Sequence, residues 1–208
     1  GTSFQSGSTQ LYFIPNQGSS RVDFTNQSIQ PVDFTISSSE NILVTDVNKD
    51  GLVDLLVGKT TGALQYWKNT GPEGTLDFSL EDDSFLELGS TVLRQNIACS
   101  VSDFDGDGKS DPVYGDQNGR LNIIGNFREA SNVVDAITEL TFNPLSGIYE
   151  ARNLGGRIWP AAVNLFGSTK PAIVVGNVLG GISILRHDEG ESLPEIPTIE
   201  IYPNPVTG

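Results

Sequence analysis

The chain repeats a pattern of short stretches in which hydrophobic and polar residues alternate. The stretches "ALQYW" (63–67), "RLNII" (120–124) and "GISIL" (181–185) share it, and "QLYFIP" (10–15) begins the same way. Such alternation is typical of a half-buried β-strand. The equivalent positions are Leu11, Leu64, Leu121 and Ile182, at spacings of 53, 57 and 61 residues. The sequence therefore predicts a repeating unit of β-strands.

Two further apolar stretches precede this strand and complete each unit. The first are "NILVT" (41–45), "IACSV" (97–101) and "WPAAV" (159–163). The second are "DLLVG" (54–58), "DPVYG" (111–115) and "AIVVG" (172–176). We expect a fourth strand near "LDFSL" (76–80) or "LTFNP" (140–144), and one or two helical turns inserted at "NVVDAITEL" (132–140). Short strands at this period predict an all-β fold of β-propeller blades, with a β-sandwich as the alternative.

The number of units predicts only part of a propeller. The chain spans three to four units, and it opens and closes on the alternating strand. Propellers close with about four to eight blades, and an open row of repeats leaves unpaired strand edges. We therefore expect residues 1–187 to be the C-terminal part of a larger propeller, with its earlier blades upstream of Gly1.

Composition supports the β interpretation and excludes several functions. Of the 208 residues 37% are hydrophobic, and 23 Gly with 11 Pro indicate many turns. The net charge of −14 argues against nucleic-acid binding, which needs a basic face. No apolar run approaches the roughly 18–20 residues of a transmembrane helix. The single cysteine, Cys99, lies in an apolar stretch, which predicts a buried and unreactive thiol.

Two acidic loops link the first and second strands of successive units, "DVNKDGLVD" (46–54) and "DFDGDGKSD" (103–111). Alternate residues of a curled loop can direct oxygens at one point, and a glycine at the sixth position permits the turn. The candidate metal ligands are Asp46, Asn48, Asp50, Leu52, Asp54, Asp103, Asp105, Asp107, Lys109 and Asp111, with Leu52 and Lys109 acting through their backbone carbonyls. Oxygen donors without His or Cys favour Ca²⁺, so two calcium sites are predicted.

The acidic loops have two alternative interpretations. One is a solvated, Asp- and Gly-rich turn, which the occurrence of two loops in one repeat phase disfavours. The other is an EF-hand, which requires Glu at position twelve, where this chain has Val57 and Tyr114. The second loop has four Asp and the first three, so the second should bind Ca²⁺ more tightly. Both affinities are expected in the extracellular range of about 10⁻⁴–10⁻³ M.

A third loop, "NLFGSTKPA" (164–172), occupies the same place in the last unit without the acidic residues. Its alternate positions are Asn164, Phe166, Ser168 and Ala172. We expect this loop to keep the turn and to bind no metal.

The two acidic loops resemble the D-x-[DN]-x-D-G-x-x-D calcium loops of FG-GAP/VCBS repeats. These form the propellers of integrin α-chain heads and of many secreted bacterial proteins. The resemblance covers roughly residues 10–187 and implies that Ca²⁺ rigidifies a hairpin between blade strands without taking part in catalysis.

The acidic stretch 188–198 is typical of a linker, and 199–208 ends in "IYPNPVTG". This string resembles the start of the type A C-terminal sorting domain, a small β-sandwich found on proteins exported by the type IX secretion system of Bacteroidetes. The matching residues are Ile201, Tyr202, Pro203, Asn204, Pro205 and Gly208. The resemblance implies export through that translocon, recognition by its outer-membrane shuttle protein, and a secreted or cell-surface location. A plain Pro-rich tail is the alternative.

The sequence offers little for catalysis. His187 is the only histidine, so no Ser-His-Asp set can form, and paired acids such as Glu81 and Asp82 fit a solvated loop better than a glycosidase site. Trp67 and Trp159 lie in strand stretches and are expected to pack rather than to stack on sugars. We expect a non-enzymatic calcium-binding propeller that binds a glycan or protein outside the cell. The alternative is an accessory region of a secreted polysaccharide-degrading or other hydrolytic enzyme.

Overall fold

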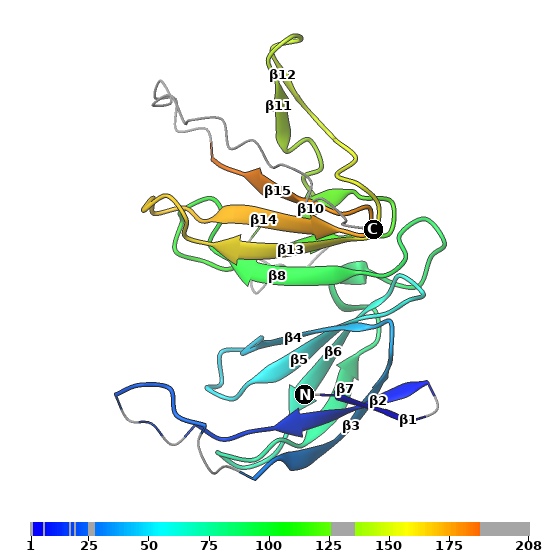
Figure 1. The fold of residues 1–208 in the computed structure, drawn as a ribbon, viewed down its shortest axis with the longest axis vertical. Coiled ribbons are helices and arrows are strands. Elements are labelled where there is room, and N and C mark those ends of the chain that lie inside the picture. The colour runs from blue at the N-terminus through cyan, green and yellow to red at the C-terminus, as the bar shows by residue number, and fades with distance from the viewer. Residues whose placement is uncertain are drawn as a thin grey trace, which may run out of the picture.

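The computed structural model describes residues 2–5, 7–16, 18, 20–24, 28–125 and 136–187, and this part of the chain is all-β (Figure 1). It contains no α-helix, only the 3₁₀ turn η1 (Phe85–Glu87). Within the same ranges, no helix has the length and apolar character needed to cross a membrane.

The described residues form fifteen strands. They are β1 (Thr2–Gln5), β2 (Ser8–Phe13), β3 (Gln30–Ser37), β4 (Asn41–Thr45), β5 (Asp54–Gly58), β6 (Leu64–Asn69), β7 (Phe78–Asp82), β8 (Ala98–Ser102), β9 (Asp111–Gly115), β10 (Leu121–Ile123), β11 (Thr141–Asn143), β12 (Ile148–Glu150), β13 (Ile158–Val163), β14 (Ala172–Asn177) and β15 (Ile182–Leu185). The first, second and alternating strands predicted for each unit are confirmed to within one or two residues.

The strands form four antiparallel meanders in chain order. Sheet 1 has the order β1-β2-β3, sheet 2 β4-β5-β6-β7, sheet 3 β8-β9-β10 and sheet 4 β13-β14-β15. A separate hairpin of β11 and β12 projects from the upper end in Figure 1. Several small antiparallel sheets in sequence order fit the blades of a β-propeller, and no closed propeller is formed by the described residues.

Consecutive sheets pack face to face, which explains why the second strands are apolar on both sides. In β5, Leu55 and Val57 pack toward sheet 1, whereas Leu56 packs toward sheet 3. The core between sheets 2 and 3 is formed by Val47, Leu56, Leu64, Tyr66, Leu88, Ile97, Tyr114 and Ile124. The core between sheets 3 and 4 is formed by Phe104, Val113, Leu121, Ile158, Ile173 and Val175. Sheets 2 and 3 thus contribute to the core on both of their faces.

The glycine that ends the second strand lets the next sheet approach. A Cβ added to Gly58 would lie 1.9 Å from the carbonyl oxygen of Ile97, and one added to Gly115 would lie 2.5 Å from Cγ1 of Ile158. Ile97 immediately precedes β8 and Ile158 begins β13, so the two stand at equivalent places in sheets 3 and 4. Only a residue without a side chain fits such a contact. The repeated glycine therefore sets the spacing between sheets.

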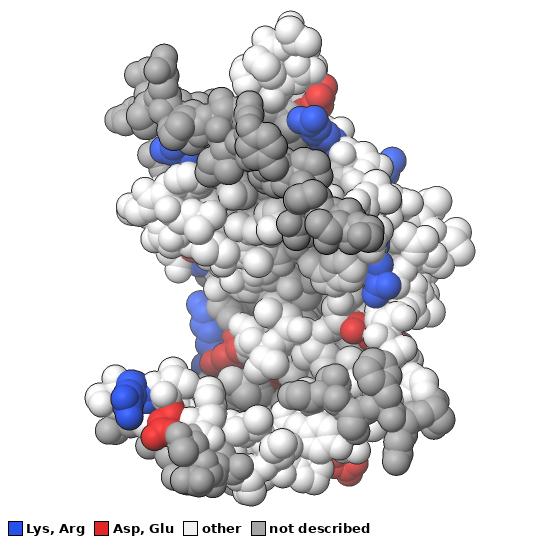
Figure 2. Space-filling model, viewed as in Figure 1, with Lys and Arg blue, Asp and Glu red and all other residues white. Residues whose placement is uncertain are grey.

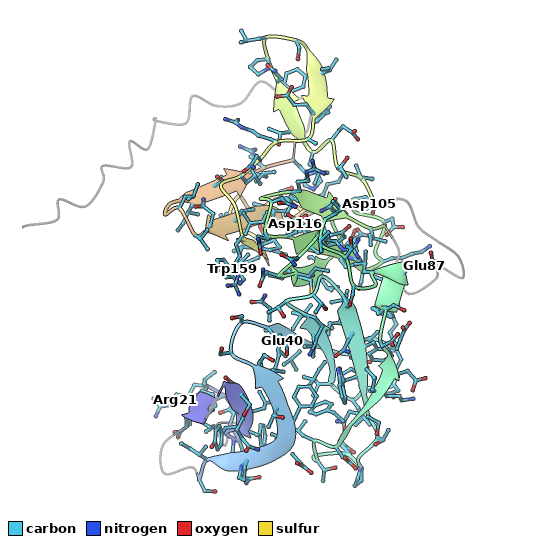
Figure 3. The ribbon with its side chains drawn as sticks, turned by 90° about the vertical axis from the view of Figure 1, so that its right-hand side faces the viewer. Arg21, Glu40, Glu87, Asp105, Asp116 and Trp159 are labelled. Carbon is cyan, nitrogen blue, oxygen red and sulfur yellow. The ribbon has the colours of Figure 1, made fainter. Side chains whose placement is uncertain are left out.

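The first strands of sheets 2, 3 and 4 lie beside one another, with β8 packed against both β4 and β13 (Figure 1). Asn41 links them, because its side-chain nitrogen donates to the carbonyl of Ile97 and its Oδ1 accepts from Nε1 of Trp159 at 2.7 Å. Trp159 thus projects toward the turn that holds Glu40 (Figure 3). Such adjacency of first strands is what a radial arrangement of blades requires.

Three expectations about the strands need correction. The fourth strand is confirmed in sheet 2 as β7, but 141–143 pairs with β12 in the separate hairpin, and the described part of sheet 3 has only an Ile123–Ile137 bridge in that place. The chain does not open on the alternating strand, since β1 pairs ahead of β2. The helical turns expected in 132–140 fall partly outside the described residues, and Ile137 lies in the bridge instead.

Of the two tryptophans, only Trp67 is a packing residue as predicted. Its ring meets Phe34 edge-on, with centroids 5.0 Å apart. Trp159 is 37% exposed, lies beneath the Arg157 guanidinium and donates the hydrogen bond to Asn41. The indole N–H of Trp159 therefore makes a polar contact with Asn41, the first residue of sheet 2.

Candidate metal-binding loops

The two acidic loops adopt one hydrogen-bonded form. The carboxylate of Asp46 accepts from the backbone N–H of Gly51 at 3.0 Å, and that of Asp103 accepts from the N–H of Gly108 at 2.8 Å. Gly51 and Gly108 have φ of 89° and 83°, which favours glycine. The first acidic residue thus closes the curl of each loop onto the sixth position, where the sequence places a glycine for the turn.

The third and fifth positions also match between the loops. Oδ1 of Asn48 accepts from the N–H of Asp50 at 2.9 Å, and Oδ1 of Asp105 accepts from that of Asp107 at 3.0 Å. The fifth residues repeat this with the seventh position, at 2.9 Å to Leu52 and 2.8 Å to Lys109. Such Asx turns curl the backbone of each loop.

The ninth residue of each loop is buried and binds the loop to the sheet. Asp54 and Asp111 have exposed fractions of 0% and 1%. Their Oδ2 atoms accept from the backbone N–H of the second loop residue, Val47 at 3.0 Å and Phe104 at 2.9 Å. Each bond draws that second residue inward, so both Val47 and Phe104 enter a hydrophobic core.

In the second loop the structure brings three predicted ligands together. Carboxylate oxygens of Asp103, Asp105 and Asp111 all lie within 4.8 Å of one another. Asp105 is exposed, so the cluster opens to solvent; Asp105 is labelled in Figure 3. Three carboxylates this close repel one another, and a divalent cation is the natural compensation. The donor set, made of hard oxygens alone, fits Ca²⁺ better than zinc or copper.

The remaining predicted ligands stand outside this cluster. Asp107 is not part of it. In the first loop the place of Asp105 is held by Asn48, whose amide donates to Asp50 at 2.9 Å. The bond from the Leu52 N–H lowers the pKa of Asp50 most, and the bond from Asn48 lowers it further. The first loop therefore brings fewer carboxylates close together than the second loop does.

The third loop has the same place and a different interior. Oδ1 of Asn164 accepts from the N–H of Gly167 at 3.1 Å, so the turn is kept as expected. Ala172 offers no acceptor at position nine, and the N–H of Leu165 bonds to the carbonyl of Val163 instead. The turn therefore forms without acidic side chains, and the absence of metal from this loop stays a prediction.

Sequence reasoning missed Tyr66 and Asn69 of β6, which donate hydrogen bonds to Asp54 of the first loop. Oδ1 of Asp54 accepts from the N–H of Asn69 at 2.9 Å, and its Oδ2 accepts from the hydroxyl of Tyr66 at 3.1 Å. Burial, and then the Asp54 carboxylate, raise the pKa of Tyr66. Asn69 in turn caps the next turn by accepting from Gly71 and Asp77. Asn16 makes the same pair of bonds in sheet 1, so the recurring Asn was the available signal.

Cys99 is half-buried and packs against the core between sheets 2 and 3. Burial raises the pKa of its thiol to about 12, so the thiol stays protonated at neutral pH. This agrees with the predicted unreactive cysteine.

The two loops lie in the part of the chain that matches a known family. The FG-GAP-like repeat matches residues 46–114, about a third of the chain. The match begins with the first acidic loop and ends in β9, the strand that follows the second acidic loop. This repeat is a non-catalytic module, and the match supports an FG-GAP repeat protein. No curated protein and no solved structure matches the chain significantly.

Proposed function

We propose that this chain is part of a secreted or cell-surface β-propeller in which Ca²⁺ holds the acidic loops and which binds a partner without catalysis. The observation that carries the proposal is the cluster of Asp103, Asp105 and Asp111 within 4.8 Å. The same hydrogen-bonded loop recurs 57 residues earlier, and FG-GAP repeats are typical of extracellular domains. Calcium would bridge the cluster and cancel its repulsion, so its role is structural.

The outer face of sheet 4 supports a propeller with further blades. Val174, Ile182 and Ile184 hold the places that Leu56, Leu64 and Tyr66 hold in sheet 2. In sheet 2 these places are buried against the next sheet, whereas Ile182 and Ile184 are 60% and 52% exposed. A Cβ at Gly176 would likewise meet nothing within 4 Å. A further blade seated on this face would complete the pattern.

Calorimetric titration and thermal unfolding test the calcium proposal. If the dissociation constant is about 10⁻⁴ M, free Ca²⁺ at about a hundred times that concentration stabilises the fold by about 2.7 kcal/mol. For a domain of this size that raises Tm by roughly 5–10 °C relative to EDTA. Mg²⁺ at equal concentration is the control, since it demands a tighter octahedral site. Equal melting temperatures in Ca²⁺ and EDTA, with no titration heat, would refute the proposal.

Export by the type IX secretion system remains a separate proposal. The residues that support it, 201–205 and Gly208, lie outside the described part of the chain. A reporter carrying residues 188–208 followed by the rest of a type A sorting domain should reach the cell surface of a host with this system. A reporter that stays in the periplasm would contradict the proposal.

A further inference from the structure

The outer edge of sheet 4 differs from the outer edges of sheets 1 and 2. In sheet 2 the third strand, β6, pairs with β7 on its outer side, and in sheet 1 β2 pairs in the same way with β3. β15 holds the place of β6 in sheet 4, and among the described residues no backbone group bonds to it on the side away from β14. The hydrogen-bonding groups along this edge of β15 are therefore unpaired.

Strand edges that stay free are normally protected against pairing with another chain, and β3 and β7 have such protection. β3 contains Pro31 and Asp33. β7 ends in Glu81 and Asp82. Each of these two strands also pairs with its neighbour through a shift in register. β15 has the sequence "ISIL", without charge or proline, and its register with β14 is regular. The edge of β15 thus has the features of a strand that accepts another strand.

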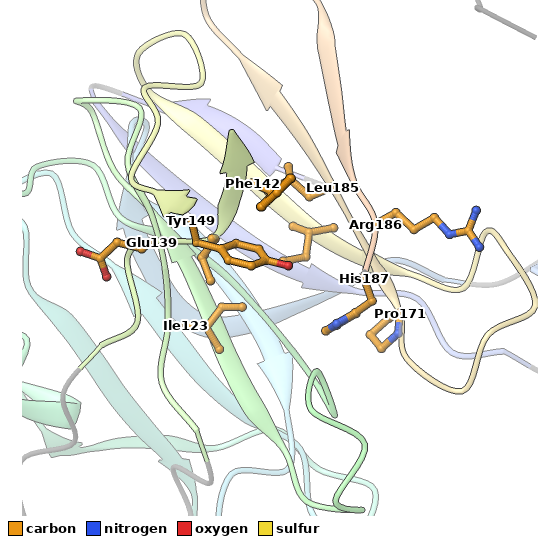
Figure 4. A pocket seen from close by; sticks show the side chains of 10 residues that line it. Ile123, Glu139, Phe142, Tyr149, Pro171, Leu185, Arg186 and His187 are labelled. Atoms are coloured by element: carbon orange, nitrogen blue, oxygen red, sulfur yellow. The ribbon is translucent and has the colours of Figure 1, made fainter. Parts of the chain in front are cut away.

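A hollow of about 250 Å³ is lined both by the end of β15 and by the β11–β12 hairpin (Figure 4). Leu185, the last residue of β15, lines it together with Phe142 and Tyr149 of the hairpin. Tyr149 extends across it and points its hydroxyl toward the side where His187 and Pro171 lie. The volume is below the roughly 300–1,000 Å³ of typical ligand pockets, so the hollow suits one large side chain.

The hairpin that forms one wall of this hollow is exposed and uncharged. Phe142 and Tyr149 face each other across it, with ring centroids 5.4 Å apart, and each is 48% exposed. Residues 141–149 contain no charged side chain, and the tip of the hairpin is white in Figure 2. Half-exposed rings on a projecting insertion contribute little to the cores, and exposed apolar surface of this kind marks a place where a partner binds.

The repeat indicates which side chain of an added strand would enter the hollow. Leu185 holds in sheet 4 the place that Trp67 holds in sheet 2, and Trp67 lies opposite Leu80 of β7. Residues that lie opposite each other in antiparallel strands have their side chains on the same face of the sheet. The residue of an added strand that lies opposite Leu185 therefore points its side chain to the face on which Leu185 lines the hollow.

We propose that an extended segment of a partner protein adds to β15 as the fourth strand of sheet 4 and places one Leu or Phe side chain in the hollow. Main-chain hydrogen bonds along the edge bind the segment, and the hollow selects the side chain. Only an extended polypeptide presents N–H and C=O groups at the spacing of the strand, which distinguishes this partner from a sugar. A further blade on Ile182 and Ile184 leaves the edge open, because blades stack through their faces. The inference rests on the proposed partner-binding function and names its partner class.

Calorimetry with synthetic peptides tests the site in the calcium-loaded chain. The probes are soluble, capped peptides that alternate Thr and Val between flanking Lys residues, with Leu, Phe or Asp at the central position. We expect the Leu or the Phe peptide to bind and the Asp peptide to bind about tenfold more weakly, since a charge is costly in an apolar hollow. Two N-methylated forms of the binding peptide, one for each of its edges, test the main-chain bonds. One form should lose binding and the other should keep it.

Changes in the chain test the hollow and the edge separately. Tyr149→Ala removes one wall of the hollow and should weaken binding of the Leu or Phe peptide about tenfold. Leu145→Ala, at the 97% exposed hairpin tip, is the matched control and should change little. At the edge, alternate amides of β15 should exchange rapidly with solvent in the unbound chain and about tenfold more slowly once the peptide is bound.

Each outcome decides the inference. The inference is overturned if neither the Leu nor the Phe peptide binds, if both N-methylated forms bind alike, or if Tyr149→Ala binds as the unaltered chain does. It is also overturned if every amide of β15 is already protected before peptide is added, and light scattering then shows whether a second copy fills the edge. Calcium titration separates this test from the proposed function, since a normal calcium response without peptide binding refutes only the peptide site.

Discussion

The second and third loops occupy the same place in successive repeats, and they differ in what fills them. In both loops the first side chain accepts from the N–H of the fourth residue, Asp103 from Gly106 at 2.7 Å and Asn164 from Gly167 at 3.1 Å. An amide closes the turn as well as a carboxylate does, so the turn itself does not require the acidic residues. The further carboxylates of the second loop also accept backbone N–H groups, and it is the closeness of three carboxylates, at Asp103, Asp105 and Asp111, that favours a cation.

Position nine accounts for a second difference. With Asp111 in place, the N–H of Phe104 points inward and the ring is 2% exposed. With Ala172 in that position, the N–H of Leu165 turns to Val163, and Leu165 is 47% exposed. The aspartate therefore has a structural role in burying the second residue, in addition to any metal. The first loop shares this role through Asp54, which makes it the place to test the comparison.

The largest effect should come from Asp54→Ala. This change leaves the N–H groups of Val47 and Asn69 and the hydroxyl of Tyr66 without their buried acceptor. Each unsatisfied group costs about 1–3 kcal/mol, and partial relaxation brings the total to about 3–5 kcal/mol. Urea unfolding in EDTA measures it without any contribution from metal. Asp50→Ala, at an exposed position, is the control, and a loss below about 1 kcal/mol for Asp54→Ala would contradict the structural role.

The next effect is a reciprocal change in calcium affinity. Asn48 and Asp105 hold the same loop position, so Asp105→Asn makes the second loop like the first, and Asn48→Asp does the reverse. We expect Asp105→Asn to weaken calcium binding by the second loop about tenfold and Asn48→Asp to strengthen calcium binding by the first loop by a similar factor. Calorimetric titration of the single and double variants measures both. Identical isotherms would show that this position is not a ligand.

Alkaline pH should lower the stability that the first loop gives to the fold more than the stability that the second loop gives. Only the first loop has a tyrosine behind position nine, because Ile123 holds the place of Tyr66 in sheet 3. The raised pKa of Tyr66 means that the fold favours its protonated form. The stability this gives is complete below the unfolded value of about 10 and is lost as pH rises above it.

Tyr66→Phe tests this dependence. The variant loses one hydrogen bond and about 1 kcal/mol at pH 7, but its stability should fall less steeply above a pH of about 10, by up to about 1.4 kcal/mol per unit. The Cys99 thiol, with its pKa raised to about 12, titrates in both proteins and cancels in the difference. Urea unfolding between a pH of about 8 and about 11 would measure the two slopes, and parallel slopes would count against the prediction.

Much of the fold could be predicted because repetition fixed the phase of each strand. The loop, the apolar strand and its final glycine recur together, so one unit predicted the next. The β11–β12 hairpin could not be predicted, because "LTF" (140–142) resembles "LDF" (76–78) at the fourth strand of sheet 2, and its actual partner "IYE" (148–150) has no counterpart in the other units. For the site, spacing pointed to Asp103, Asp105 and Asp111, which the structure brings together, and the metal itself stays a prediction. The second role of Asp54 depends on Tyr66 and Asn69, which meet it only through the pairing of β5 with β6.

The smallest effect concerns a link between the second and third loops. A Cβ at Gly106 would lie 3.1 Å from Cε of Lys170, so the lysine stem of the third loop lies along the second. Its positive charge near the cluster should oppose a divalent cation weakly, since solvent and salt screen it. We expect Lys170→Gln to raise calcium affinity about twofold at low salt, with the gain lost at high salt. Lys59→Gln, whose ammonium pairs with Glu40 at 2.6 Å in sheet 2, is the matched control. If Lys170→Gln instead lowered the affinity, the lysine would be supporting the second loop through packing. The third loop would then help to shape the metal site of the second loop.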